Sequence, residues 1–173
     1  MTTKNSAFIG ARAFIGIAVA ILVLGGLIWV ARPTAQSTPS TSARSNGTLA
    51  VEGSNNYDFG TVSMAAGKVK YNFIITNISS EAVTIEKMYT SCMCTTASLA
   101  LAGQQFGPFG MPGHMAIPEI NQTIKPGETA SVEVVFDPAA HGPAGVGRTE
   151  RTVTIENNVG QPVELQFVAV VTP

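Results

Sequence analysis

The sequence is poor in cysteine and in charge, and each scarcity excludes a class of protein. Two cysteines in 173 residues are too few for the disulfide framework of a small secreted scaffold. Charged residues make up 12% of the chain and the formal net charge is −1, so nothing indicates the basic patch that captures nucleic acid. We therefore expect no nucleic-acid partner. The length fits about one domain with appendages.

Familiar catalytic motifs are also missing. The sequence contains neither the G-x-S-x-G turn of serine hydrolases nor the H-E-x-x-H helix of zinc proteases. A nucleophile built from Cys94 with His114 or His141 is the remaining catalytic alternative. We expect a binding or interaction domain and not an enzyme.

One long apolar run lies near the N-terminus. Residues 13–31 are nineteen residues without a charge, and a helix of that length spans roughly 28 Å, close to the apolar thickness of a bilayer. The preceding residues 1–12 carry Lys4 and Arg12 but no acidic residue, and positive charge tends to stay cytoplasmic. We predict a cytoplasmic tail over 1–12 and a transmembrane anchor over 13–31.

A cleaved signal peptide is the alternative for this run, although its apolar region is usually only about 7–15 residues long. Under either interpretation the remainder is exported, to the periplasm or the cell surface. Residues 32–47 are mostly Ser, Thr and Pro, a composition that favours a disordered tether. The folded domain is predicted over 48–173.

Beyond residue 47 the apolar residues alternate with period two, which is typical of strands that bury one face. Turn signals rich in Gly, Pro and Asn separate these segments. The pattern predicts about seven strands in an all-β, immunoglobulin-like sandwich. The expected strands are 49–52, 58–62, 69–75, 82–89, 130–136, 152–156 and 163–171.

An ordered series of short motifs runs along the predicted domain: Tyr57–Val62, Thr76–Asn77, Val83–Ile85, Thr90–Thr96, Ile124–Glu128 and Val135–Pro138. This series resembles the bacterial family called Domain of Unknown Function 1573. The resemblance extends from Val51 to Pro173 and implies a single immunoglobulin-like domain related to the ASPM, SPD-2 and Hydin modules, exported on a lipid or helical anchor. It implies no established activity. The chain departs from the family in having Met93 where many members have glycine, and in a long insertion before Ile124.

Cys92 and Cys94 are separated by one residue, so in a strand both sulfurs would point to the same face. Three interpretations stay open. The pair forms a strained, reducible disulfide, it supplies two thiolates to a soft metal ion, or it consists of small buried apolar side chains.

The insertion between residues 102 and 127 favours the metal interpretation. It is rich in Gly and Pro, and long structureless loops in compact domains are usually functional or disordered. Met111, His114 and Met115 bring two thioethers and an imidazole into five residues. Thiolate and thioether donors select Cu(I). We therefore predict Cys92 and Cys94 as metal ligands together with Met111, His114 and Met115, with copper(I) as the possible cofactor.

Two further residues are weaker ligand candidates. Met93 would point away from the cysteines in a strand, and His141 lies in a glycine-rich run that reaches them only if the two loops share one end of the sandwich. The alternative to a metal-binding domain is a structural or protein-interaction module of the cell envelope. The sequence does not specify an envelope partner or an oligomeric state.

Overall fold

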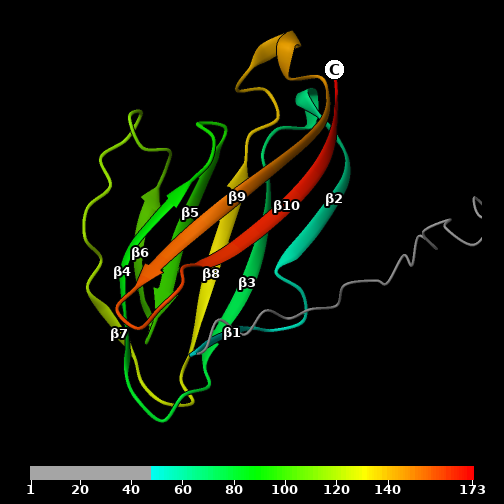
Figure 1. Cartoon of the computed structure of the whole chain (residues 1–173). Coiled ribbons are helices and arrows are strands. Elements are labelled where there is room, and N and C mark those ends of the chain that lie inside the picture. Colours follow the sequence, from blue (N-terminus) through cyan, green and yellow to red (C-terminus); the bar gives the residue numbers. More distant parts are fainter. Residues whose placement is uncertain (1–47) are drawn as a thin grey trace, which may run out of the picture. The chain divides into compact units, whose positions relative to one another are not determined.

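Ten β-strands and two 3₁₀ helices make up the part of the chain that the computed structural model describes, residues 48–173 (Figure 1). These residues contain no α-helix, and none of their helices could cross a membrane. The predicted all-β class is therefore confirmed for this segment. The predicted cytoplasmic tail, anchor and tether lie outside the described residues.

The first sheet has the strand order β1-β3-β8-β5-β6, and all its neighbouring strands are antiparallel. Its central strand β8 places Val132 opposite Phe73 on one side and opposite Leu99 on the other. The strands are β1 (Leu49–Val51), β3 (Val69–Asn77), β5 (Thr95–Leu101), β6 (Gln104–Phe109) and β8 (Thr129–Phe136).

The second sheet has the order β2-β10-β9-β4-β7. Its edge strand β2 runs parallel to β10, whereas the other pairs are antiparallel. The strands are β2 (Asn56–Ser63), β4 (Val83–Thr90), β7 (Gln122–Ile124), β9 (Gly147–Asn157) and β10 (Val163–Thr172). The 3₁₀ helices are η1 (Met64–Ala66) after β2 and η2 (Gly142–Gly145) before β9.

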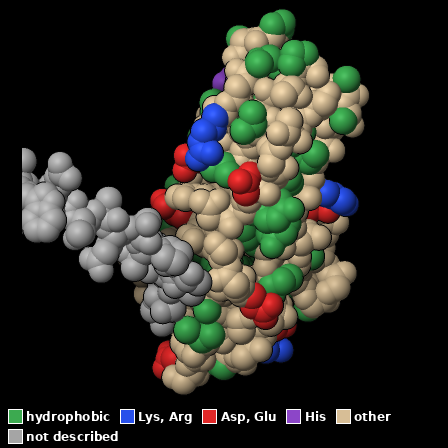
Figure 2. Space-filling model, turned by 90° about the vertical axis from the view of Figure 1, so that its right-hand side faces the viewer, with side chains coloured by type: hydrophobic (Ala, Val, Ile, Leu, Met, Phe, Trp, Pro, Cys, Tyr) green, Lys and Arg blue, Asp and Glu red, His purple; other side chains and the backbone are tan. Residues whose placement is uncertain are grey.

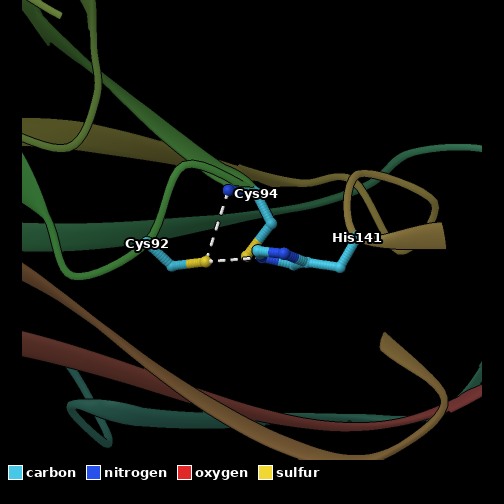
Figure 3. A group of neighbouring side chains, drawn as sticks. All are labelled: Cys92, Cys94 and His141. Atoms are coloured by element: carbon cyan, nitrogen blue, oxygen red, sulfur yellow. Dashed lines mark hydrogen bonds between the residues drawn. The ribbon is translucent and has the colours of Figure 1, made fainter. Parts of the chain in front are cut away.

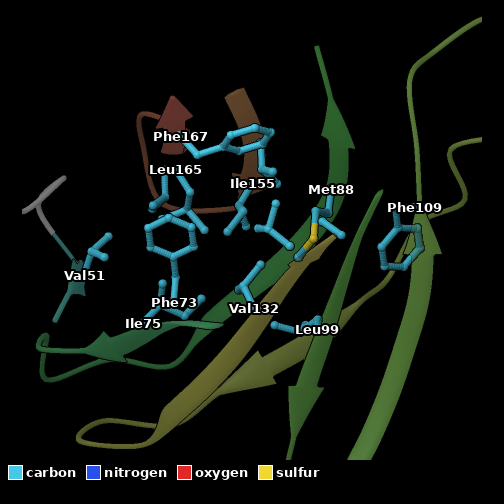
Figure 4. Packing of buried hydrophobic residues seen from close by; sticks show 14 of the residues in the cluster. Val51, Phe73, Ile75, Met88, Leu99, Phe109, Val132, Ile155, Leu165 and Phe167 are labelled. Carbon is cyan, nitrogen blue, oxygen red and sulfur yellow. The ribbon is translucent and has the colours of Figure 1, made fainter. Parts of the chain in front are cut away.

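The core lies between the two sheets, where the inward residues of each strand meet (Figure 4). Ile75 and Val132 of the first sheet and Ile155 of the second are fully buried. Alternation along each strand produces this arrangement, because successive side chains point to opposite faces. Aromatic rings also pack across the layers, as in the contact of Phe136 of the first sheet with Phe167 of the second, whose ring centroids lie 5.1 Å apart.

The predicted number of about seven strands is lower than the ten strands that the described residues form. All seven expected strands are present with small changes of bounds, but β5, β6 and β7 were missed. Strand β5 consists mainly of small residues and leucine, which have weak strand preference, and it is held by pairing with β8. Strand β6 contains Pro108, which an edge strand tolerates because no partner needs its missing N–H. The insertion 102–127 is thus not structureless throughout.

A buried asparagine organises one end of the sandwich. Asn77 is completely buried, and its Nδ2 donates hydrogen bonds to the Glu81 carbonyl at 2.7 Å and to the Ile124 carbonyl at 2.8 Å. Its Oδ1 accepts from the N–H of Ser79 at 3.0 Å. These bonds tie the turn after β3 to β7. Since β7 pairs with the start of β4, the turn after β4 lies at the opposite end.

The surface of the domain carries few charges. On the face shown in Figure 2, the Lys and Arg side chains are separated by polar and apolar residues and do not gather into one patch. The two ion pairs of the described residues, Lys68–Asp137 and Lys70–Glu133, involve largely exposed lysines. Such pairs contribute little to stability, so the apolar core and the sheet hydrogen bonds hold the fold.

Candidate metal centre

The cysteines lie in the turn that joins β4 to β5, and the prediction that they occupy a strand is wrong. Residues 91–94 cross from the second sheet to the first, so the chain must reverse within four residues. The N–H of Thr95 donates to the Cys92 carbonyl at 3.1 Å, and the Thr90 hydroxyl lies 3.0 Å from that same oxygen. This tight turn still brings the two sulfurs together, while Met93 at its tip is 49% exposed.

Hydrogen bonds to β9 fix the turn from its other side. The N–H of Ser91 donates to the Thr152 carbonyl at 2.9 Å, and the Ser91 hydroxyl accepts from the N–H of Thr152 at 2.9 Å. Both cysteines are free and buried. The turn that carries both sulfurs is therefore anchored to β9.

A loop from a distant part of the chain completes the group. Residues 137–146 follow β8, and the N–H of Asp137 donates to the Cys94 carbonyl at 2.8 Å, which joins the two loops. The exposed His141 then lies with its Nε2 3.1 Å from Cys92 Sγ (Figure 3). The ligand atoms of Cys92, Cys94 and His141 all lie within 4.8 Å of one another. Two sulfurs and one imidazole nitrogen thus converge at one end of the sandwich.

Gly145 allows the loop to fold over in this way. A Cβ at this position would lie 3.1 Å from the Cβ of His141, closer than ordinary van der Waals contact. Gly145 closes η2, for which His141 is the N-terminal flanking residue. The absence of a side chain at Gly145 therefore leaves room for the Cβ of His141.

Arg151 contributes the positive charge of the site. It lies on β9, and its Nε donates a hydrogen bond to Cys94 Sγ at 3.2 Å. Its Nη1 donates to the Glu150 carbonyl at 2.8 Å, so the guanidinium is held at two points. A cation beside sulfur stabilises the thiolate form, which is the form that binds metals.

The pKa values of the two thiols move in opposite directions. Burial by itself raises the pKa of Cys92, but hydrogen bonds from Cys94 and His141 and the charge of Arg151 lower this pKa overall, to about 7. For Cys94, burial and the hydrogen bond to Cys92 raise the pKa, and the hydrogen bond from Arg151 opposes them. One thiolate is therefore available near neutral pH, and it is stabilised by its neighbours.

The predicted Met-His loop begins near this end, but its histidine is not a member of the cysteine cluster. The Gly110 carbonyl accepts from the N–H of Thr90 at 3.1 Å, which places the start of the loop beside the end of β4. The N–H groups of His114 and Met115 both donate to the Met111 carbonyl, at 3.1 and 3.0 Å. The histidine that joins the cysteines is His141 and not His114. Met111 and Met115 stay predicted ligands.

Arg151 was not among the residues predicted for the site, and His141 was predicted to reach the cysteines only on a condition that the structure fulfils. The condition was a shared end of the sandwich, and the bond from Asp137 to Cys94 provides it. Arg151 was missed because its proximity to Cys94 depends on how β4 pairs with β9, with Thr90 opposite Val153. No spacing in the chain reveals that register.

The fold and the cluster define the class of protein: an immunoglobulin-like β-sandwich with a thiol–imidazole group in the loops at one end. The model of a family described as "Protein of unknown function (DUF1573)" matches residues 51–104. The resemblance seen in the sequence motifs is thereby confirmed for that segment. The matched segment includes both cysteines and ends before His141 and Arg151.

Solved structures show similarity at low sequence identity. A protein of unknown function from Porphyromonas gingivalis W83 is 16% identical, with 78% of this chain and 51% of that chain covered and a TM-score of 0.52. The VesB protease of Vibrio cholerae is 16% identical, with 72% and 32% covered and a TM-score of 0.46. The ASH/PapD-like domain of human CEP192 is 11% identical, with 72% and 85% covered and a TM-score of 0.41. This chain thus spans about half of the Porphyromonas protein.

The similarity to the Porphyromonas protein supports the fold alone. No curated protein matches the chain.

Proposed function

We propose that this domain binds a soft metal ion, Cu(I), through Cys92, Cys94 and His141. The observation that carries the proposal is the convergence of three ligand atoms within 4.8 Å. Two of the three atoms are sulfurs, and soft thiolate donors select Cu(I), zinc or iron–sulfur clusters among biological metals. A third donor of imidazole type suits copper and zinc.

The number of donors favours Cu(I) over a structural zinc. Structural zinc sites are almost always four-coordinate and tetrahedral, whereas Cu(I) is commonly stable with two or three ligands. The described Cys and His residues supply three donors. Met111 and Met115 are candidates for an additional thioether ligand, because their loop starts beside the end of β4.

The environment of the cysteines supports metal binding over a purely apolar role. A small apolar side chain needs no polar partner, yet Cys92 Sγ contacts an imidazole nitrogen at 3.1 Å and Cys94 Sγ accepts from a guanidinium at 3.2 Å. Metal ligands are typically oriented by non-ligating partners of the kind that Arg151 provides for Cys94. The exposed position of His141 gives an ion a path from solvent to buried sulfurs.

We further propose that the domain is held outside the cytoplasm by the apolar run 13–31. The support is the length of that run and the positive charge before it. The Ser/Thr/Pro composition of 32–47 would let the domain reach an ion or a partner away from the membrane surface.

Titration of Cu(I) against a competing chelator tests the function. The full chain is purified in detergent under reducing conditions, and wild type is compared with Cys92→Ser/Cys94→Ser and with His141→Ala. Loss of both thiolates should weaken binding by more than about 100-fold, since removal of mere outer-shell partners already costs 10–100-fold. Circular dichroism shows whether each variant keeps its fold.

Replacement of the exposed His141 serves as a second variant because it does not disturb the buried core. Cu(I) affinity that is unchanged in both variants would overturn the proposal. The cysteine pair would then be a core or disulfide element of a structural or protein-interaction module.

A further inference from the structure

Among residues 48–173, Arg151 is the one Lys or Arg side chain with a hydrogen bond to a cysteine sulfur. Its Nε donates to Cys94 Sγ at 3.2 Å, and its Nη1 is held by the Glu150 carbonyl at 2.8 Å. The register of β9 fixes where it can lie, because Arg151 pairs with Phe167 of the neighbouring strand. Two hydrogen bonds therefore hold the guanidinium in a defined position beside the sulfur of Cys94.

The charges around the cluster can be counted. The two thiolates bring two negative charges, a ligating histidine is neutral, and Arg151 brings one positive charge. Asp137, the acidic residue of the His141 loop, is engaged elsewhere: its Oδ1 accepts from the N–H of Ala139 at 3.0 Å and its Oδ2 lies 3.8 Å from Lys68 Nζ. The donor set with Arg151 thus carries one net negative charge.

We propose that Arg151 is a specificity-determining residue that makes this site prefer a monovalent soft ion, Cu(I), over the divalent ion Zn²⁺. This inference depends on the proposed metal-binding function. With Cu(I) the cluster and Arg151 become neutral together, whereas with Zn²⁺ they keep one uncompensated positive charge. A net charge in a partly buried site is unfavourable.

The selectivity arises because Arg151 affects the two ions unequally. Its stabilisation of the thiolates helps both ions alike, but its repulsion of the bound ion doubles when the ion is divalent. For one additional charge about 5 Å away, with an effective dielectric constant of about 20, the effect on relative affinity is on the order of 10- to 100-fold after solvent screening. The ratio of the two affinities isolates the repulsion between Arg151 and the bound ion. Both ions must displace the same protons from the same thiols, so that cost cancels in the ratio.

Substitution of Arg151 separates charge from donor number. The count of three Cys and His donors also disfavours structural zinc, but Arg151→Gln leaves those donors unchanged. Arg151→Lys keeps the charge and loses the planar guanidinium. Arg148→Gln is the matched control, because Arg148 is an exposed residue of the same strand and its loss changes the net charge of the protein equally.

The affinities of the full chain for Cu(I) and for Zn²⁺ are measured in detergent under reducing conditions by competition with a chelator for each ion. The ratio of Cu(I) affinity to Zn²⁺ affinity should fall on the order of 10- to 100-fold in Arg151→Gln. It should change less than about threefold in Arg151→Lys and in Arg148→Gln. If Arg151→Gln does not fold, Arg151→Leu, which retains apolar packing without a charge or a soft donor, is measured instead.

The outcomes distinguish the inference from the function on which it depends. Binding of both ions with an unchanged ratio in the neutral variants would overturn the role of Arg151 and leave Cu(I) binding intact. A wild-type chain that does not bind Cu(I) would overturn the proposed function, and the inference with it. An equal fall of the ratio in Arg148→Gln would also overturn the inference, since overall charge would then explain the effect.

Discussion

Cys92 Sγ lies 3.1 Å from His141 Nε2, although 49 positions separate the two residues in the chain. The turn after β4 supplies the sulfur, and the loop after β8 supplies the imidazole. A single backbone hydrogen bond, from the N–H of Asp137 to the Cys94 carbonyl at 2.8 Å, joins these loops directly. This bond joins the loop that carries His141 to the cysteine turn, and His141 is the histidine of the cluster.

Replacing His141 should therefore weaken Cu(I) binding, and replacing His114 should not. We expect His141→Ala to reduce Cu(I) affinity by at least about tenfold, because it removes one of three clustered donors. His114→Ala should change the affinity less than about twofold, since His114 lies outside the cluster. Both affinities are measured by chelator competition. An equal loss in the two variants would show that the Met-His loop closes over the cysteines when the ion binds.

Gly145→Ala should disturb the site through His141. The new Cβ would lie 3.1 Å from the His141 Cβ, so the loop must shift and the imidazole with it. We expect roughly a tenfold loss of Cu(I) affinity, while the free energy of unfolding changes by less than about 1 kcal/mol because the loop is at the surface. Gly160→Ala is the control, since a Cβ there meets nothing within 4 Å. A normal affinity in Gly145→Ala would contradict the close approach.

The metal-free protein should ionise its two thiols in separate steps. The pKa of Cys92 is lowered from 9.0 to about 7, whereas that of Cys94 is raised. The ultraviolet absorbance of the thiolate should therefore rise first near pH 7 and again above pH 9. Cys92→Ser should abolish the first step, and His141→Ala should move it to higher pH. A single step near the ordinary thiol pKa in the native wild type would contradict this prediction.

The same shifts predict opposite effects of pH on stability. The lowered pKa of Cys92 stabilises the native state fully above pH 9, and this contribution is lost as the pH falls through about 7. The raised pKa of Cys94 acts in the opposite sense: native stability declines as the pH rises above the ordinary thiol value, because the folded state resists the second ionisation. Urea unfolding of metal-free wild type and of Cys92→Ser at several pH values measures the first effect. The difference between the two proteins should shrink from pH 9 towards pH 6.

Asn77→Ala should destabilise the domain without changing the metal site. The substitution removes the donor of the buried Ile124 carbonyl and of the part-buried Glu81 carbonyl, which costs about 2–4 kcal/mol of unfolding free energy. Cu(I) affinity of the folded protein should be unchanged, because Asn77 lies at the opposite end of the sandwich from the cysteine turn. Asn72→Ala, at an exposed position of the same strand, is the control. Similar stability of the two variants would contradict the structural role of Asn77.

The strands that the sequence predicted are those whose own residues alternate. In β3 and β8, apolar side chains at every second position reveal the buried face directly. Strand β5 shows no clear alternation, and its place between β8 and β6 comes from pairing with residues far away in the chain. Strand β6 was not predicted because it contains glycine and proline, which are rare in strands but tolerated in an edge strand. Local patterns therefore identify strands that bury one face, and they miss strands held mainly by their neighbours.

For the site, the sequence indicated the chemistry of the sulfurs but not their partners. A C-x-C pair and a cluster of methionines pointed to soft ligands, and the structure keeps the cysteines together although in a turn and not in a strand. The choice of His114 followed from proximity in the chain, which is a poor guide to proximity in a β-sandwich. Strands of such a fold return to the same end after tens of residues, so loops far apart in sequence become neighbours.

The sequence by itself determined the all-β class of the described residues and the presence of a thiol pair, because alternation and spacing are local properties. Only the tertiary structure decided that Cys92 faces His141 and that Cys94 faces Arg151. Those contacts depend on the register of β4 against β9 and on the bond between the loops after β4 and β8. Register and loop contact are set by the packing of the two sheets as a whole, and no short stretch of the chain encodes them.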